Sequence, residues 1–336
     1  MQTRRTVYFN APRQVEVRQE PIPQPGLGQV LVQTLFSAIS PGTEMLVYRG
    51  QFPDLPVDAS IESLEGGFAY PLAYGYACVG RVIQTGPGVG AEWQDRLVFS
   101  FQPHTSFFTC EPHALMPLPA GLSPETACFL PNMETAVNLV QDGAPLLGEN
   151  VLVFGQGIVG LLTTALLAQF PLGSLVCVDL LANRRAAALA SGATAAFDPC
   201  EQYFKQQAQQ LLGSGADLVF ELSGAPQALD QAIALTRFSG RVLIGSWYGT
   251  KRAPLDLGGS FHRSRIRLIS SQVSSIAPEL SGRWDKTRRF NLAWQALERI
   301  QPEKWISARF PIAQAAAAYE LLDQRPGEVM QIVFEY

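Results

Sequence analysis

Three closely spaced glycines constrain this chain more than any other feature. They stand in Gly155-Gln156-Gly157-Ile158-Val159-Gly160, after the apolar run Asn150–Phe154 and at the start of a helical run. In such a strand–turn–helix unit the first glycine makes the tight turn, the second lets a ligand approach the backbone, and the third lets the helix pack closely on the strand. The helix N-terminus offers N–H groups to a pyrophosphate. We therefore expect residues 155–160 to bind a dinucleotide.

An acidic residue after the next predicted strand supports this interpretation. Asp179 follows the apolar run Ser174–Val178 and lies about nineteen residues beyond Gly160. A carboxylate there accepts a hydrogen bond from a ribose hydroxyl and repels a 2′-phosphate, so the pattern favours NAD over NADP. Arg184 and Arg185 follow closely and are suited to binding a phosphate, which keeps NADP as the alternative.

Hydrophobic periodicity divides the 336 residues into two predicted domains. Short β-rich runs between Pro and Gly clusters fill the first part, and buried strands alternate with Ala-rich helices beyond Ser123, which indicates parallel βαβ units. The expected strands are Val15–Val17, Gln29–Leu35, Gly80–Gln84, Arg96–Phe101, Val151–Phe154, Ser174–Val178, Asp217–Glu221, Arg241–Gly245 and Val329–Phe334, with helices ending at Ile300 and spanning Ala313–Asp323. We predict a β-rich domain of residues 1–122 and 300–336, and a Rossmann domain, a doubly wound parallel sheet, of residues 123–299.

Charge and cysteine usage exclude several classes of protein. The formal net charge is −4 and the sequence pI is near 5.5, so no basic field attracts nucleic acid or a membrane surface. Residues 1–7 are not followed by an apolar signal segment, and we expect a soluble, cytoplasmic protein that binds a small-molecule substrate. The five cysteines are scattered and form no CxxC pair, which argues against a disulfide framework or a cysteine-rich zinc lobe.

The order of these features resembles the medium-chain dehydrogenase/reductase superfamily over nearly the whole chain. The matching motifs are Ala38–Glu44, Pro71–Gly80, Val82–Gly86, Asp95–Val98, Leu118–Leu122 and Gly240–Gly245. The resemblance implies a GroES-like distorted barrel beside an α/β Rossmann domain, with the nicotinamide between them. It implies NAD(P)-dependent hydride transfer, and it also suggests a homodimer.

Two departures from that superfamily concern its catalytic zinc. Zinc-using members carry a cysteine directly before the triplet that matches Gly42–Glu44, where this chain has Pro41. They carry Gly-His-Glu where this chain reads Gly75-Tyr76-Ala77, and Glu134 lies near the third ligand position. Catalytic zinc needs three protein ligands, and neither proline nor alanine donates to a metal. The resemblance therefore implies no zinc and a branch similar to bacteriochlorophyllide dehydrogenases, whose motifs match Ser40–Glu44, Phe101–His104, Phe261–Arg265 and Ser270–Val273.

Hydride transfer to a carbonyl without zinc needs a hydroxyl or imidazole to stabilise the developing oxyanion. Thr43 matches the superfamily's proton-relay hydroxyl, Tyr76 replaces the lost histidine, and His104 follows in an aromatic-rich segment. Each has a structural alternative: Thr43 as a helix cap, Tyr76 as a filler of the zinc space, and His104 as a buried histidine. Glu44 replaces an aspartate that supports a metal ligand in relatives, and its task is open.

Small residues after two further strands complete the predicted cofactor site. Ser223 follows the strand ending at Glu221, and Gly245 and Ser246 follow the next strand. Cofactors bind at the carboxyl ends of parallel strands, although small residues there also make ordinary turns.

The leading functional hypothesis is a zinc-independent NAD(P)-dependent oxidoreductase that acts on a secondary alcohol or ketone. The alternatives are an enone or quinone reductase of the same fold and a non-catalytic nucleotide-binding protein. The sequence carries no readable code for the substrate, and the insertion Asp54–Tyr70 is either a lid over the site or a surface loop.

Overall fold

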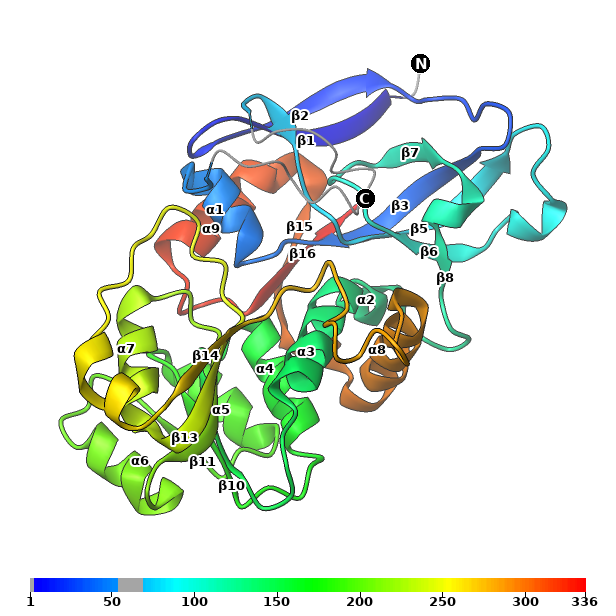
Figure 1. The fold of residues 1–336 in the computed structure, drawn as a ribbon. Helices are drawn as coiled ribbons and strands as arrows, with labels where there is room; N and C mark the ends of the chain where they lie inside the picture. The colour runs from blue at the N-terminus through cyan, green and yellow to red at the C-terminus, as the bar shows by residue number, and fades with distance from the viewer. Residues whose placement is uncertain (1–2, 54–68) are drawn as a thin grey trace. The chain divides into compact units, whose positions relative to one another are not determined.

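The computed structural model describes residues 3–53 and 69–336, which form two units (Figure 1). One unit comprises Met1–Pro131 and Leu297–Tyr336, and the other comprises Asn132–Ala296. The first boundary lies after the predicted residue 122 because helix α2 (Pro124–Ala127), capped by Ser123, packs on strands of the first unit. Most of the insertion Asp54–Tyr70 lies outside the described residues. None of the helices described is long and apolar enough to cross a membrane.

The second unit is built on a six-stranded sheet in which every pair of neighbouring strands is parallel. Its strand order is β11-β10-β9-β12-β13-β14. The bounds are β9 (Asn150–Phe154), β10 (Ser174–Val178), β11 (Ala195–Phe197), β12 (Ala216–Glu221), β13 (Thr236–Ile244) and β14 (Arg267–Ser270). This is the 3-2-1-4-5-6 order of a doubly wound dinucleotide-binding sheet, so the predicted Rossmann fold is confirmed.

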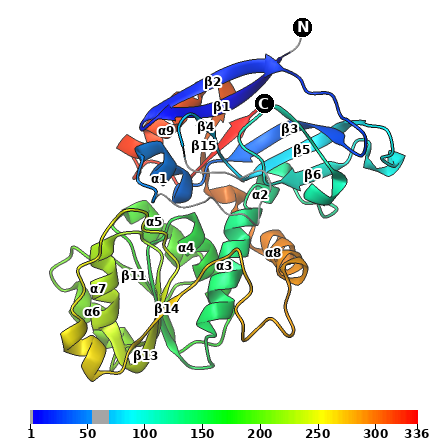
Figure 2. The same cartoon turned by 45° about the horizontal axis from the view of Figure 1, so that its top comes forward.

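Helices cover both faces of this parallel sheet (Figure 2). They are α3 (Leu130–Gly143), α4 (Ile158–Leu167), α5 (Ala182–Ala190), α6 (Phe204–Leu212) and α7 (Pro226–Leu235), and α8 (Lys286–Ile300) lies beside α3. Leu152 and Phe154 of β9 share an apolar cluster with α6 and α7, whereas Gly143 of α3 packs against Phe220 on the opposite face. Because strands covered on both faces are continuously apolar, the sequence pattern identified β9, β10 and β12.

The first unit contains two sheets, as expected for the β-rich domain. A three-stranded antiparallel sheet joins β1 (Thr3–Ala11), β2 (Gln14–Pro21) and β4 (Leu72–Ala73). The larger sheet has the order β15-β16-β3-β5-β6-β8, and β7 also pairs with β3. Its strands are β3 (Val30–Ala38), β5 (Cys78–Thr85), β6 (Leu97–Ser100), β7 (Phe107–Cys110), β8 (Met116–Pro117), β15 (Ile306–Pro311) and β16 (Gln331–Glu335).

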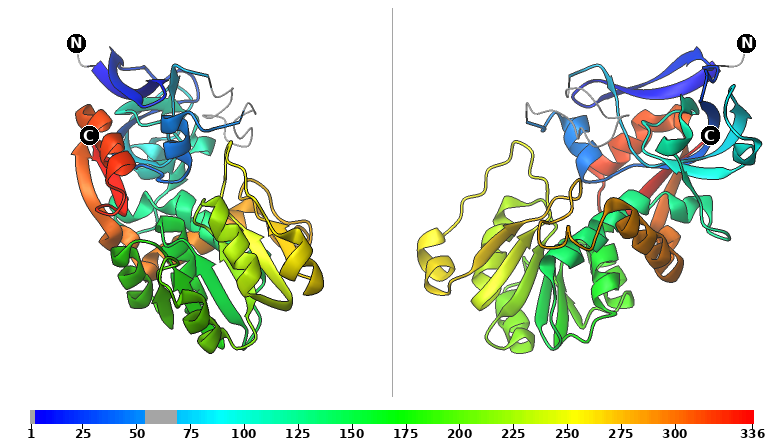
Figure 3. Two further views of the ribbon diagram at one scale, coloured as in Figure 1. Left: turned by 90° about the vertical axis from the view of Figure 1, so that its left-hand side faces the viewer. Right: turned by 45° about the vertical axis from the view of Figure 1, so that its right-hand side comes forward.

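The C-terminal segment completes the first unit. Strand β16 pairs with β3, and helix α9 (Ala315–Gln324) packs against β2, so orange and red segments lie next to blue ones in Figure 3. Phe9 contacts Tyr319 with ring centroids 5.1 Å apart, and Tyr319 contacts Phe334 at 6.2 Å. The expected helix 313–323 and strand 329–334 are therefore present as α9 and β16, and both contribute to one core with the N-terminal strands.

Candidate functional site

The glycine turn between β9 and α4 has the backbone geometry that its sequence requires. Gly155 has a φ of 86°, and a Cβ there would lie 2.6 Å from backbone atoms of Ser223. A Cβ at Gly160 would lie 1.9 Å from the carbonyl oxygen of Gly155. At Gly157 the nearest atom to a Cβ is Arg184 Nη1 at 4.0 Å, so space is open there. The first and third glycines serve packing, and the second leaves room for a ligand.

Asp179, the residue that follows β10, forms a hydrogen bond with this turn. Its Oδ2 accepts a hydrogen bond from the Gln156 backbone N–H at 2.7 Å, and its Oδ1 accepts one from Leu181 N–H at 2.9 Å. Gln156 is fully buried, its side chain accepts a hydrogen bond from Thr164, and its backbone N–H is used by Asp179, so it supports the turn from within. Each Asp179 oxygen has a second lone pair for a ribose hydroxyl.

Ile158 and Val159 form the first turn of α4, which begins directly after Gly157. The Ile158 side chain is buried, and no side chain caps the helix. These two residues therefore present backbone N–H groups at the helix N-terminus, where an anion is favoured.

Arg184 is the arginine that faces the glycine turn. Its Nη1 lies 4.0 Å from Asp179 Oδ2, and its Nε is buried without an acceptor among the residues described. Arg185 instead donates to the carbonyl oxygens of Asp179 and Leu180 and to Asp198, which fixes the loop. Because an unsatisfied buried donor is costly, Arg184 and the open space at Gly157 fit an anionic group such as a cofactor phosphate.

Two loops at the carboxyl edge of the sheet are bonded to each other. Ser246 Oγ accepts from Gly224 N–H at 2.9 Å and donates to the Glu221 carbonyl at 3.3 Å, while Ser223 donates to the Glu221 carboxylate. A Cβ at Gly245 would lie 2.4 Å from a side-chain carbon of Leu139. Ser223, Gly245 and Ser246 thus lie at one edge of the sheet. Glu221 lies there as well, although the sequence alone identified it only as the end of a strand.

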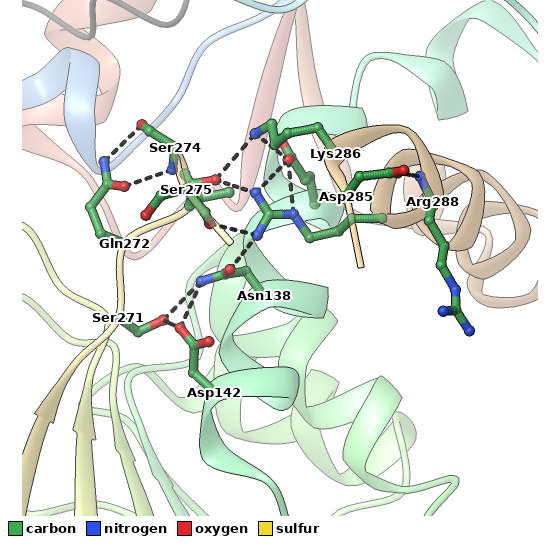
Figure 4. A network of polar contacts seen from close by, with 12 residues as sticks. Asn138, Asp142, Ser271, Gln272, Ser274, Ser275, Asp285, Lys286 and Arg288 are labelled. Carbon is green, nitrogen blue, oxygen red and sulfur yellow. Dashed lines mark hydrogen bonds and ion pairs between the residues drawn. The ribbon is translucent and has the colours of Figure 1, made fainter. Parts of the chain in front are cut away.

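The segment after β14 is tied to α3 by a polar network (Figure 4). Ser271 donates to Asp142 at 2.6 Å and accepts from Asn138 at 2.9 Å. Fully buried Arg289 donates to Glu134 at 3.0 Å and to the carbonyl oxygen of Ser275 at 3.0 Å. Glu134 also accepts from Lys286 at 2.5 Å. Glu134 is therefore engaged by two cations in a structural network.

A second polar cluster lies in the first unit around Glu44 of α1 (Thr43–Arg49). The Glu44 side chain is fully buried and accepts from Ser40 N–H at 2.8 Å and from the Tyr319 hydroxyl at 2.5 Å. His104 Nε2 lies 2.9 Å from Glu44 Oε2, and His104 Nδ1 lies 2.6 Å from Ser37 Oγ. In the neutral ring, Nε2 donates to Glu44 and Nδ1 accepts from Ser37. Glu44, which the sequence left without a task, organises this cluster.

His104 is enclosed on every side that the structure describes. Its side chain is fully buried, and a Cβ at Gly75 would lie 2.8 Å from His104 Nε2. Both ring nitrogens are occupied by Glu44 and Ser37. This placement favours a positioning role for His104 over direct contact with a substrate.

Tyr76 and Thr43 come together next to this cluster. The Ser40 and Thr43 hydroxyls lie close enough to the Tyr76 phenol to lower its pKa. Burial raises the pKa of Tyr76 to about 12, the Glu44 charge adds to the rise, and the hydrogen bonds with Ser40 and Thr43 oppose it. Helix α1 is capped by Gly42 without a side-chain bond, so the alternative role of Thr43 as the cap is wrong. Ser40 belongs to this group of hydroxyls, and the sequence alone did not identify it as a candidate site residue.

The donor set around Tyr76 does not fit a zinc ion. Within residues 3–53 and 69–336, no three His, Cys, Asp or Glu side chains are grouped to share a metal. Pro41 offers no donor, and His104 uses both of its nitrogens in hydrogen bonds. We therefore assign no reaction step to zinc.

A Rossmann sheet with a glycine turn and an acidic residue after its second strand, in one chain with a β-rich unit, defines an oxidoreductase of the dehydrogenase class. Residues 159–289 match the family described as zinc-binding dehydrogenase. Over these residues the sequence is therefore similar to zinc-binding dehydrogenases.

Several known dehydrogenases are similar to this chain in sequence or in fold. The chain is 25% identical to sorbitol dehydrogenase 1 of Saccharomyces cerevisiae over 304 residues, covering 78% of this chain and 81% of that protein. It is 27% identical to L-threonine 3-dehydrogenase of Pyrococcus horikoshii over 262 residues, covering 68% and 71%. The crystal structure of an Escherichia coli CFT073 alcohol dehydrogenase complexed with NADH superposes with a TM-score of 0.80 at 18% identity, covering 99% of each chain, which supports the fold.

Proposed function

We propose that this protein is a zinc-independent NAD(P)-dependent oxidoreductase that interconverts a secondary alcohol and a ketone, with NAD as the favoured cofactor. The observation that carries the proposal is the hydroxyl cluster of Ser40, Thr43 and Tyr76, in which the phenol has a raised pKa. The curated relatives named above are sorbitol and threonine dehydrogenases, and both named substrates carry hydroxyl groups on secondary carbons. The proposal includes a cytoplasmic location, a homodimer and a small-molecule substrate.

The second unit holds the cofactor in this proposal. The glycine turn and the N-terminus of α4 bind the pyrophosphate, and Asp179 accepts hydrogen bonds from a ribose. The carboxylate favours the unphosphorylated ribose of NAD, while the unsatisfied Nε of Arg184 gives NADP a partner for its phosphate. A bound nicotinamide cofactor supplies the hydride donor or acceptor that the chain's own side chains lack.

The first unit supplies the proton and the hydrogen bonds in this proposal. With a pKa near 12 the Tyr76 phenol is protonated at neutral pH, so it donates a hydrogen bond to a carbonyl oxygen. Thr43, whose hydroxyl lowers the pKa of that phenol, passes the proton between the phenol and solvent in this proposal. Glu44 and His104 act as positioning residues, because both side chains are fully buried. Glu44 accepts from the Ser40 N–H, and His104 connects Glu44 to Ser37.

Reduction of an enone or quinone is the competing activity, because it needs the same polarised carbonyl. The decisive experiment measures turnover with secondary alcohols and ketones against enones and quinones, using both NADH and NADPH. We expect turnover of secondary alcohols and ketones, and we expect this activity to persist after dialysis against a chelator. Elemental analysis should find less than one zinc per chain. Activity restricted to enones, or activity lost on chelation and restored by zinc, would refute the proposal.

A further inference from the structure

A fully buried carboxylate lies at the carboxyl end of β12. Glu221, the last residue of that strand, is 0% exposed. Its Oε1 accepts from Ser223 N–H at 2.8 Å and from the Ser223 hydroxyl, and its Oε2 accepts from the Tyr248 hydroxyl at 2.6 Å. In the part of the chain that the structure describes, no Lys, Arg or His nitrogen lies within ion-pair distance of it.

Hydrogen-bond donors surround both oxygens of Glu221. The Ser223 N–H donates to Oε1, and the Tyr248 phenol, whose pKa is raised mainly by burial, donates to Oε2. Three donors at one carboxyl group favour the carboxylate over the carboxylic acid. Hydrogen bonds, rather than a cation, therefore stabilise a negative charge inside the protein.

Glu221 ends β12, which belongs to the second half of the sheet, so its charge is expected to lie near the nicotinamide end of a bound dinucleotide. Strands β9, β10 and β11 form the first mononucleotide-binding half of the sheet, which carries the glycine turn and Asp179. Strand β12 opens the second half, whose carboxyl edge faces the other nucleotide. In an NAD(P) enzyme with its pyrophosphate on the glycine turn, that other nucleotide is the one with the nicotinamide.

Glu221 also holds together the two loops of that edge. Ser223 follows it in one loop, and Tyr248 belongs to the other, where Lys251 donates to the carbonyl oxygen of Gly224 at 2.8 Å. The first loop packs on Gly155, since a Cβ at that glycine would lie 2.6 Å from Ser223. The charge is thus fixed in place relative to the glycine turn.

We propose that the Glu221 carboxylate sets the redox preference of the bound cofactor by stabilising the oxidised nicotinamide, which is positively charged, relative to the neutral reduced form. The inference rests on the proposed function, because it requires a nicotinamide cofactor. A unit charge several ångströms away in protein surroundings changes the ratio of two dissociation constants by roughly threefold to thirtyfold. Glu221 is a positioned charge here and needs no direct contact with the cofactor.

The test compares the Kd values of NAD⁺ and NADH, or of the phosphorylated pair if the wild type binds it more tightly, by calorimetry at fixed ionic strength. Glu221→Gln removes the charge with little change in shape, and we expect NAD⁺ binding to weaken relative to NADH by roughly threefold to thirtyfold. Asp217→Asn is the matched control, because Asp217 lies at the amino end of the same strand. We expect it to leave the NAD⁺/NADH ratio unchanged.

The outcomes separate the inference from the function on which it rests. Equal weakening of both redox forms in Glu221→Gln would make Glu221 merely structural and overturn the inference alone. Failure of the wild type to bind either form would overturn the proposed function as well. If Glu221→Gln does not fold, Tyr248→Phe is the second variant, because it keeps the Glu221 charge and removes one hydrogen-bond donor to it. A ratio of NAD⁺ to NADH dissociation constants equal to that of the wild type supports the inference. A ratio shifted as far as expected for Glu221→Gln overturns it.

Discussion

Gly157 allows cofactor binding to be separated from folding by a single substitution. Its backbone has a φ of −66°, and a Cβ there meets only Arg184 at 4.0 Å, so a side chain fits without strain. Gly157→Asp places a carboxylate at the helix N-terminus where the pyrophosphate is expected, and repulsion should weaken NADH binding by more than about a hundredfold. The measurement is an NADH fluorescence titration.

Gly157→Ala is the matched control for that substitution. It adds one methyl group in the same open space and no charge. We expect a weakening of NADH binding of no more than about tenfold and an unchanged circular dichroism spectrum for both variants. Normal NADH binding by Gly157→Asp would place the cofactor elsewhere.

Tyr76 is the residue on which the chemical step depends in the proposed function. Tyr76→Phe keeps the ring and removes the donor, so kcat should fall by roughly a hundredfold or more while the Kd of NADH stays the same. Thr43→Val should act in the same direction, and the double variant should lose little beyond Tyr76→Phe because both hydroxyls serve one bond network. A rate for Tyr76→Phe within twofold of the wild type would remove the phenol from the mechanism.

The raised pKa of Tyr76 also gives a dependence of stability on pH. The phenol titrates near 10 in the unfolded chain and near 12 in the folded one, so folding favours its protonated form. This contribution is fully present below pH 10 and is lost as the pH rises toward 12. We expect the free energy of unfolding of the wild type to fall more steeply over that interval than that of Tyr76→Phe, measured by urea titration. Parallel curves would show that the phenol is not perturbed.

Through a family resemblance the sequence predicted Thr43 and Tyr76 separately as candidate catalytic groups, and in the structure the Thr43 hydroxyl affects the pKa of Tyr76. It did not predict that Glu44 contacts His104, since sixty positions separate the two and no local pattern records such a contact. Nor did it identify Glu221 as more than a strand residue, because the hydrogen bond from Tyr248 arises only when two loops meet at the sheet edge. Sequence motifs identify residues that act together with their neighbours in the chain. Contacts between distant segments can be identified only once the fold is known.

At the scale of the secondary elements, Arg289 of α8 connects the segment after β14 to α3. Arg289→Met leaves Glu134 buried with one cation fewer and frees the carbonyl oxygen of Ser275. Removing one partner of a buried pair typically costs about 3–5 kcal/mol, so we expect a loss of that size in the free energy of unfolding. Denaturation by urea measures it.

Arg288→Met provides the comparison from the neighbouring position on α8. Arg288 is exposed and stacks on Trp284 at 4.1 Å, without a buried charge to satisfy. We expect little change in stability from this variant. Equal losses from the two substitutions would show that helix content, and not the buried network, accounts for the effect.

Several strands that the sequence pattern did not identify lie at the edge of a sheet. Strands β11, β14 and β15 are examples, whereas β1, which was also not identified, lies between β2 and β4. The three edge strands span three, four and six residues and are only partly buried. An edge strand lacks the continuous apolar run of a central parallel strand, so its sequence is hard to distinguish from a loop. Central strands such as β9 and β12 were predictable for the opposite reason.

At the scale of the whole molecule, the last strand stabilises a unit that begins with the first residues. Phe334 of β16 is fully buried and contacts His104 and Tyr319, with ring centroids 5.0 and 6.2 Å away. Phe334→Ala should lower the free energy of unfolding by about 3–5 kcal/mol. Glu335→Ala, at the exposed next position, should have little effect, and a similar loss there would argue against core packing as the cause.

The pairing of β16 with β3 also determines the order in which the two units are completed during synthesis. Every strand of the parallel sheet lies between residues 150 and 270, so that sheet is available once the middle of the chain has left the ribosome. The first unit must wait for residues 331–335, because β3 and β15 are joined only through β16. Although domains usually fold from the N-terminus onward, apolar residues of β1 and α1 here lack their core partners until residues 312–334 have been made. We expect these early residues to be available to chaperones during that interval.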